Sequence, residues 1–186
     1  MQSIDRRRGI SIHRAADAAD MAETDFMTAP EPPPRGALEM QAMLGDDAAA
    51  GSELKVLVRD AGGFSLLHVW FKGNYRLPRH THNVDCMYYV ISGSAIMGKQ
   101  TLRAGDSFFV PAGAPYRYSA GPDGVEVLEV RHGAKQFDIK LLDDGPDQWD
   151  ALAGVMESNK VAWSRQPVSP TFLANRPSEA DAATSG

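Results

Sequence analysis

Two histidines separated by one residue, His80 and His82, are the side chains in this sequence whose types and spacing favour metal chemistry. In an extended strand successive side chains alternate between faces, so these two imidazoles point the same way. They are then close enough to hold one metal ion, whereas the alternative is a pair of surface or packed histidines. Neutral imidazoles suit iron, nickel, copper and zinc. The spacing therefore predicts that the pair binds one divalent metal ion.

The pair lies within the first of two sequence motifs. The first runs from Gly73 to Gly93 as G-N-Y-R-L-P-R-H-T-H-N-V-D-C-M-Y-Y-V-I-S-G, and the second from Gly105 to Tyr116 as G-D-S-F-F-V-P-A-G-A-P-Y. Together they resemble the two motifs of the cupin superfamily, in its single-domain, RmlC-like form. The resemblance spans residues 73–118 and extends more weakly from about residue 53 to 142. It implies an all-β fold, the cupin double-stranded β-helix (jelly-roll barrel), with short flanking helices.

Two positions depart from the ligand set that the resemblance implies. Cys86 stands where the family has an acidic ligand, and Tyr116 stands where it has a third histidine. A thiolate would suit zinc, copper or iron, but a free cysteine is more often a small buried hydrophobe, and we favour that role for Cys86. A phenol has an ordinary pKa of about 10, so Tyr116 is expected to donate a hydrogen bond to substrate or to act as an acid or base.

Strand alternation predicts which side chains share the interior with the histidine pair. Counting by twos, Tyr88 lies on the face of Cys86, and Tyr118 on the face of Tyr116. If the family positions are kept, all four converge on the histidines. We therefore expect Tyr88, Tyr116 and Tyr118 to be the catalytic residues, with Cys86 in the same pocket.

Two further histidines are candidates for the site. His132 follows a predicted strand and shares a face with Leu128 and Val130, a face expected to point inward, so His132 is a candidate third metal ligand. His68 lies on a strand face with other large side chains. It is expected to be either a hydrogen-bonded core histidine or a pocket residue.

Two carboxylates, Asp85 and Glu129, are further candidates for the pocket. Asp85 is one residue away from the acidic position of the motif, and a β-bulge would be needed to turn it inward. Glu129 is expected on the face opposite His132, where it can pair with Arg103 or Arg131.

The elements that must position these side chains are short strands separated by turn sequences. Ser92 to Ser94 is expected to be a hairpin turn, and Gly121 to Gly124 another. This spacing is typical of a double-sheet barrel. The predicted strands are Leu54–Val58, Phe64–Phe71, Met87–Ile91, Ser94–Met97, Gln100–Leu102, Ser107–Val110, Tyr116–Ser119, Val125–Arg131 and 136–141.

The flanks of the barrel have a different composition. Residues 1–35 are rich in alanine, aspartate and proline and are predicted to be a flexible arm. The barrel is assigned to residues 36–145, beginning with a short helix at 37–44 that Gly45 ends. A C-terminal helix at 146–163 has apolar residues on one side and is expected to cover an open end of the barrel. Residues 164–186 are predicted to be a mobile tail.

Composition excludes several classes of protein. The chain has 186 residues with 43% hydrophobic content, which suits one domain. Its net charge is −5 without a long basic run, so nucleic-acid binding is not expected. The single cysteine suits a reducing cytoplasm, and the lack of a run of about 20 apolar residues argues against a membrane partner. We predict a cytoplasmic homodimer, because an arm and an exposed sheet edge favour pairing.

The resemblance and the histidine pair together predict a metal-dependent enzyme acting on a small organic molecule. The cofactor would be a divalent transition metal, with Fe, Ni, Mn, Cu and Zn all open. Dioxygenase-like oxidoreductase chemistry and lyase or isomerase chemistry remain alternatives. A non-catalytic cupin that only binds a small ligand is the competing hypothesis, favoured by the changes at Cys86 and Tyr116.

Overall fold

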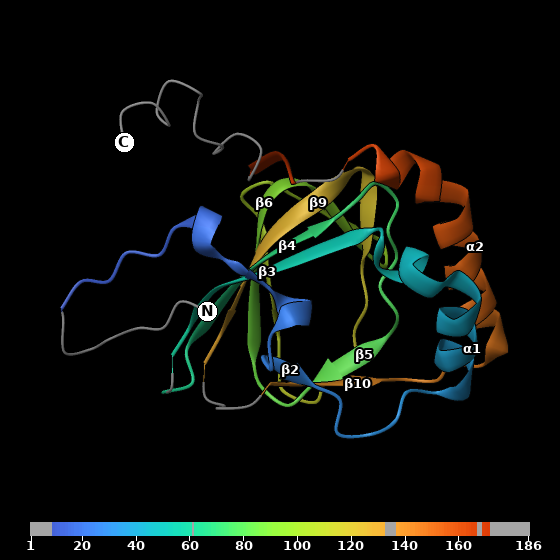
Figure 1. The fold of residues 1–186 in the computed structure, drawn as a ribbon, viewed down its shortest axis with the longest axis horizontal. Coiled ribbons are helices and arrows are strands. Elements are labelled where there is room, and N and C mark those ends of the chain that lie inside the picture. Colours follow the sequence, from blue (N-terminus) through green and yellow to red (C-terminus); the bar gives the residue numbers. More distant parts are fainter. Residues whose placement is uncertain (1–8, 61, 133–136, 167–168, 172–186) are drawn as a thin grey trace.

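The strands of the protein form two sheets in the computed structural model, which describes residues 9–60, 62–132, 137–166 and 169–171 (Figure 1). In this part of the chain the larger sheet has the order β1-β3-β4-β9-β6-β7, with β8 also paired to β6, and the smaller has the order β2-β10-β5. The strands are β1 (Ala19–Asp20), β2 (Met27–Thr28), β3 (Ser52–Arg59), β4 (Ser65–Phe71), β5 (His80–His82), β6 (Cys86–Met97), β7 (Gln100–Arg103), β8 (Ser107–Val110), β9 (Ser119–Arg131) and β10 (Phe137–Leu141). The helices are α1 (Arg35–Leu44), α2 (Pro146–Ser164) and the 3-10 turns η1 (Ala15–Asp17), η2 (Met21–Glu23) and η3 (Gly45–Ala49).

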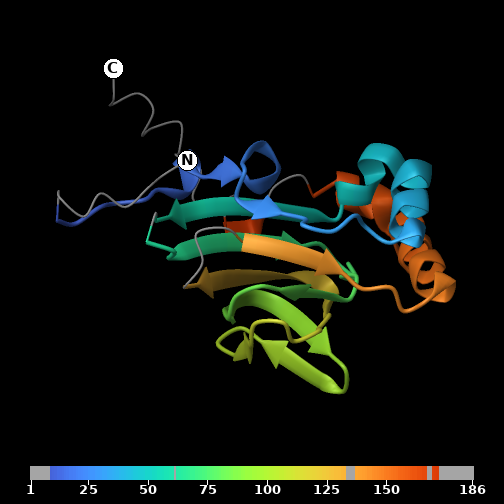
Figure 2. The ribbon, with the colours of Figure 1, turned by 90° about the horizontal axis from the view of Figure 1, so that it is seen from below.

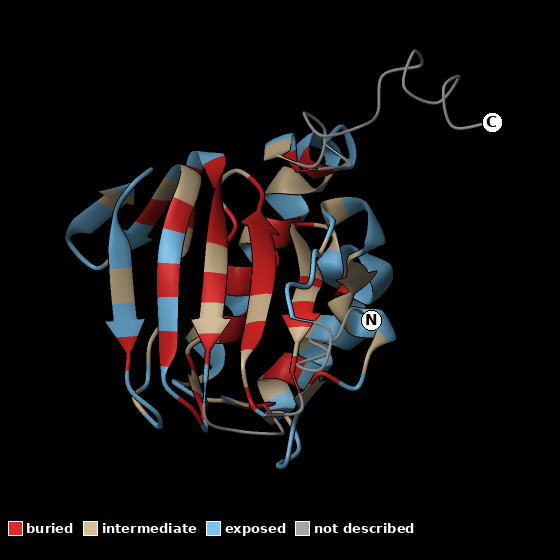
Figure 3. Cartoon of the chain, turned by 90° about the vertical axis from the view of Figure 1, so that its left-hand side faces the viewer, coloured by how far each residue is buried: buried red, intermediate tan, exposed pale blue. Residues whose placement is uncertain are grey.

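Strand periodicity explains how the larger sheet encloses a core. Along β6, Cys86, Tyr88 and Val90 are buried, whereas Met87 and Tyr89 between them are exposed. The middle strands of the sheet are buried more continuously, while strands toward one edge alternate (Figure 3). The chain therefore has the all-β, double-sheet architecture with short helices that its sequence predicts.

Two predicted turns are wrong, because each is part of a longer strand. Gly93 lies inside β6 at a positive φ of 70°, where the pairing with β9 shifts register. A Cβ atom at Gly93 would come within 2.1 Å of the carbonyl oxygen of Gly124, so the close approach of the two strands requires glycine. Residues 121–124 likewise belong to β9. Glycine here marks bulges and close contacts between strands rather than chain reversals.

The two main helices lie side by side at one end of the strands (Figures 1 and 2). Gly36 of α1 faces the indole of Trp149 of α2 so closely that a Cβ atom would lie 2.3 Å from the ring. Trp163, near the end of α2, is fully buried, and its indole N–H donates to the carbonyl of Gly73 over 2.9 Å. Its ring also packs near Tyr75. These contacts hold α2 against the barrel. Helix α1 ends at Gly45, as predicted.

The N-terminal segment differs from the flexible arm expected, because the part described from residue 9 onward pairs with both sheets. β1 pairs with β3, and β2 pairs in parallel with β10. Between them Phe26 is buried, with its ring 5.8 Å from that of Phe137. Residues 1–8 lie outside the described residues.

The C-terminal segment also makes a specific contact beyond α2. Ser169 is buried, and Thr171 donates to the carboxylate of Glu126 through its backbone N–H over 3.0 Å and its hydroxyl over 2.7 Å. The rest of the predicted mobile tail, residues 167–168 and 172–186, falls outside the described residues. Within the described part of the chain, no helix is both long and apolar enough to span a membrane.

Candidate functional site

The histidine pair is held by β5, a strand of three residues between β10 and the second sequence motif. His82 pairs with Ile139 of β10, and His80 exchanges two backbone hydrogen bonds with Tyr116, over 3.1 and 3.0 Å. His80 is 4% exposed and His82 7%, while Thr81 between them faces the other way. The ring centroids of the two imidazoles are 4.8 Å apart. The alternation read from the sequence therefore does bring both rings to one place.

Hydrogen bonds to the backbone fix how each imidazole is oriented. The Nδ1 atom of His80 lies 2.8 Å from the carbonyl oxygen of Pro78, and that of His82 lies 2.8 Å from the carbonyl oxygen of Asp138. A carbonyl only accepts, so we assign the ring proton to Nδ1, which leaves Nε2 with a free lone pair. Burial lowers the pKa of both rings, that of His82 to about 4 with a further contribution from neighbouring His80. Both rings are therefore neutral at pH 7.

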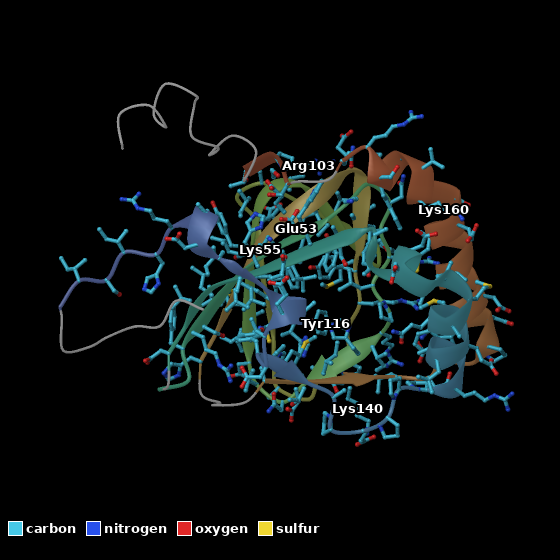
Figure 4. The ribbon with its side chains drawn as sticks, in the orientation of Figure 1. Glu53, Lys55, Arg103, Tyr116, Lys140 and Lys160 are labelled. Carbon is cyan, nitrogen blue, oxygen red and sulfur yellow. The ribbon has the colours of Figure 1, made fainter. Side chains whose placement is uncertain are left out.

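A cavity of about 210 Å³ opens in front of the pair. Its wall is largely apolar, and one part carries polar side chains from four strands or loops. In Figure 4, Tyr116 lies near the middle of the view, whereas Lys140 and Lys160 lie toward its edge. The lining residues are Met21, Met27, Ser52, Leu54, Val69, Phe71, Tyr75, Leu77, Pro78, His80, His82, Tyr88, Tyr116, Tyr118, Glu129, Arg131 and Ile139.

Polar side chains beside the histidines form one chain of neighbours. Tyr88 and Glu129 are direct partners across β6 and β9, and the phenol of Tyr88 helps to lower the pKa of the Glu129 carboxylate. The hydroxyls of Tyr88 and Tyr116 are in short contact, and either one can be the hydrogen-bond donor. The carboxylate of Glu129 also pairs with Arg131, with 2.5 Å between Nη2 and Oε2. The chain of polar side chains therefore runs from Tyr116 through Tyr88 and Glu129 to Arg131.

The charge states of this chain follow from burial and pairing. Burial alone would raise the pKa of Glu129, but the charge of Arg131, with smaller contributions from His82 and the hydrogen bonds to the carboxylate, outweighs it and holds that pKa below its usual value. Burial raises the pKa of Tyr88, Tyr116 and Tyr118, so all three phenols stay protonated. The polar part of the cavity carries one positive and one negative charge.

Cys86 is close to this group but does not line the cavity. It is 0% exposed, its thiol donates to the carbonyl of Val84 over 3.5 Å, and burial raises its pKa. Its direct partner across the strands is Arg131. These contacts are those of a protonated thiol in the core, in line with the role favoured from the sequence.

The interior face of β9 was predicted wrongly. Val127, Glu129 and Arg131 are buried on the cavity side, whereas Leu128 and Val130 occupy the other face. His132 follows the strand in an exposed position, so the structure does not bring it to the histidine pair. Of the two partners expected for Glu129, Arg103 and Arg131, the structure pairs it with Arg131.

The remaining candidates lie outside the cavity. His68 is buried on the opposite face of β4, with Nε2 3.5 Å from a carboxylate oxygen of Glu126, and it has the role of a core histidine. Asp85 is at the surface, where it accepts the backbone N–H of Ala112 over 2.8 Å. Two cavity residues, Met21 and Met27, were missed because they come from the N-terminal segment.

The donor set fits a transition metal only in part. Two neutral imidazoles with fixed orientation are typical metal ligands, and backbone carbonyls are common partners for their second nitrogen. In the described part of the chain, however, no group of three His, Cys, Asp or Glu side chains is arranged to hold an ion. Any remaining coordination positions would have to be filled by substrate or water.

Comparison with known families agrees with this architecture. Residues 68–131, from β4 to the end of β9, match the family model described as the Cupin domain. The matched segment contains both sequence motifs and the histidine pair. Over these residues the chain is similar to the cupin family.

Three similar solved structures have low sequence identity to this chain. An RmlC-like cupin from Shewanella frigidimarina is 24% identical, over 46% of this chain and 78% of that one, with a TM-score of 0.42. KdgF from Halomonas sp. is 21% identical, over 45% and 81%, with a TM-score of 0.40. The polyketide cyclase RemF from Streptomyces resistomycificus is 16% identical, over 79% and 98%, with a TM-score of 0.49. No curated protein matches the chain. At these values no activity is transferred from the similar structures to this chain.

Proposed function

We propose that the protein is a metal-dependent enzyme that acts on a small organic molecule bound in the barrel cavity. The supporting observation is the histidine pair. Both imidazoles are buried and neutral, and both have Nδ1 engaged by a backbone carbonyl, so Nε2 of each is available to an ion. Two histidines in a surface or packing role would not need this matched orientation.

A divalent metal on His80 and His82 would supply a Lewis acid that polarises an oxygen of the substrate. The residues of the chain supply the rest. The apolar wall excludes water from the bound molecule, and Tyr116, in contact with the His80 ring at 4.4 Å between centroids, lies where it can exchange a proton with substrate. Tyr88 shares a hydrogen bond with Tyr116 and has Glu129 as its partner across the strands, so both lie where they can take part in balancing a proton that Tyr116 gives up or receives. Dioxygenase-like and lyase or isomerase reactions both use such a site.

A second candidate function, non-catalytic binding of a small molecule, is favoured by a different observation. Cys86 is not in the cavity, and Glu129 is held by Arg131, so neither offers a free ligand. A cavity with two histidines alone would then bind an organic molecule without an ion.

Metal content separates the two candidates. The parent, without added histidine tags, is equilibrated with each of Fe(II), Mn(II), Co(II), Ni(II), Cu(II) and Zn(II), desalted, and analysed for bound metal. The His80→Ala/His82→Ala variant is treated alike, with exposed His132→Ala as the matched control. The proposal expects about one ion per chain in the parent and control and none in the double variant. A parent that retains no ion, or a double variant that keeps one, would leave the binding function as the better account.

A further inference from the structure

A strip of apolar side chains crosses four strands on the outer face of the larger sheet, the face that points away from the cavity. Phe109 of β8 is paired with Met87 of β6, and Met87 is paired in turn with Val130 of β9. Val130 is paired with Leu66 of β4. Side chains that are paired on one face of a sheet are near enough to touch. The four side chains therefore form one continuous strip.

A second apolar pair lies beside this strip. Tyr89 and Leu128, two residues along β6 and β9 from the strip, are direct partners. Phe109 is 54% exposed, Tyr89 47% and Met87 42%, while the other side chains are half-buried. In the view onto this face, no described helix or strand lies in front of β6 (Figure 3). We call these six residues the outer patch: Leu66, Met87, Tyr89, Phe109, Leu128 and Val130.

The charge of the outer patch favours a second copy of the chain as its partner. None of its residues is charged, and Val58 and Ser107, which are paired with its edges, are uncharged as well. The whole chain has a net charge of −5, so two copies repel each other over much of their surface. In a two-fold dimer a patch meets the same patch of the other copy. An uncharged patch can do so without bringing like charges together.

The area of the outer patch is close to what a dimer needs. Phe109 and Tyr89, at about half exposure, offer roughly 100 Å² each. With Met87 and the three half-buried aliphatic side chains the apolar surface comes to roughly 400 Å², a size at which surface patches are often functional. A standard interface buries about 800 Å² on each partner, of which somewhat more than half is apolar. Exposed polar neighbours such as Ser107 and His132 would supply the rim.

The N-terminal segment is not free to provide the contact instead. In the described part of the chain, β1 pairs with β3 and β2 pairs with β10 of the same chain. The dimer contact expected from an N-terminal arm is therefore replaced by a contact through the face of the sheet.

We propose that two copies of the chain associate face to face through the outer patch. Phe109, Met87 and Tyr89 of one copy then pack against the outer patch of the other, which removes their exposed surface from water. The cavity lies on the opposite face of the sheet and stays open in the dimer. The inference is thus independent of the metal and of the proposed function.

The mass of the parent in solution is the first test. It is measured by light scattering and sedimentation velocity from one to several hundred micromolar. The proposal expects a mass of twice 20.2 kDa in the upper part of this range. A mass of 20.2 kDa at every concentration would overturn it.

Lysine substitutions locate the interface. Met87→Lys places a positive charge in the outer patch of each copy, and we expect the dissociation constant of the dimer to rise about 100-fold or more, because like charges in an interface repel. Met43→Lys is the matched control, since Met43 is 64% exposed but lies on α1, and it should associate as the parent does. A Met87→Lys protein that remains as dimeric as the parent, or a Met43→Lys protein that dissociates, contradicts the assignment. If circular dichroism shows that Met87→Lys is unfolded, Phe109→Lys makes the same test at the end of the strip.

Oxidation of Met87 distinguishes a second copy from cover by the same chain. This control is needed because the C-terminal segment reaches the same face, where Thr171 bonds Glu126. Conversion of Met87 to the sulfoxide by hydrogen peroxide is followed by mass spectrometry in the parent and in Phe109→Lys. The proposal expects slow oxidation in the dimeric parent and oxidation about tenfold faster in the dissociated variant. A Met87 that stays protected in a monomeric variant would show that its own chain covers the patch, and would refute the dimer.

Discussion

His82 gives a quantitative prediction about acid stability. In the folded protein its pKa is lowered to about 4 from an ordinary value of 6.5, mainly by burial. Below pH 6.5 the unfolded chain takes up a proton at this ring, whereas the folded chain does so only near pH 4. Protonation therefore favours the unfolded state, and stability is lost as the pH falls through this interval. His80 is shifted in the same direction and adds to the loss.

The magnitude follows from the width of the interval. Each pH unit between the two pKa values corresponds to about 1.4 kcal/mol, so His82 lowers the free energy of unfolding by about 2.5 kcal/mol between pH 7.5 and 4.5. Buried carboxylates act at lower pH. Glu126, with a pKa lowered to about 2 from 4.5, loses its contribution only below about pH 4.5. The interval from 7.5 to 4.5 therefore reports mainly on the histidines.

The assay is urea unfolding of EDTA-treated protein at several pH values. His82→Asn removes the titrating ring but keeps an N–H that can donate to the carbonyl of Asp138. Its loss of stability between pH 7.5 and 4.5 should be smaller than that of the parent by about 2.5 kcal/mol. Exposed His132→Asn should show the loss of the parent. A His82→Asn protein that loses as much as the parent would refute the claim that burial keeps this ring neutral.

Three further changes test the fold around the site. Trp163→Ala should lower the free energy of unfolding by about 3–5 kcal/mol in urea, because it removes a fully buried indole with its hydrogen bond; a loss below 1 kcal/mol would contradict tight docking of α2. Gly93→Ala should cost about 1–3 kcal/mol more than Gly113→Ala, since both have positive φ but only Gly93 faces backbone at 2.1 Å; equal losses would argue against the clash. Cys86→Ser should cost about 1–3 kcal/mol, and the Co(II)-treated parent should show no sulfur-to-metal band in the near ultraviolet, whose presence would identify Cys86 as a ligand.

Strong alternation made part of the site predictable from the sequence. His80 and His82 flank a single residue, and Cys86 and Tyr88 alternate with exposed neighbours. The inward-facing residues of β5 and β6 could therefore be identified from the sequence. In β9 both faces carry apolar side chains, with Val127 on one and Leu128 and Val130 on the other. The sequence therefore did not show which face of β9 points into the cavity, and Arg131 was missed as a cavity residue.

The role of the N-terminal segment could not be read from composition. Its prolines, alanines and aspartates indicate a free arm, while Met21, Phe26 and Met27 are too widely spaced to show a period. Their burial depends on β10, whose Phe137 lies more than a hundred residues away along the chain. Contacts of this kind arise from tertiary packing, and local sequence patterns do not predict them.

The cavity is lined by two parts of the chain whose sequences can vary separately, and Met21 and Met27 belong to one of them. The histidines, phenols, Glu129 and Arg131 all come from residues 75–131, whereas these methionines come from a segment outside the residues that match the family model. Substitutions in the segment around residues 21–27 would reshape the space offered to a ligand while leaving the reactive groups in place.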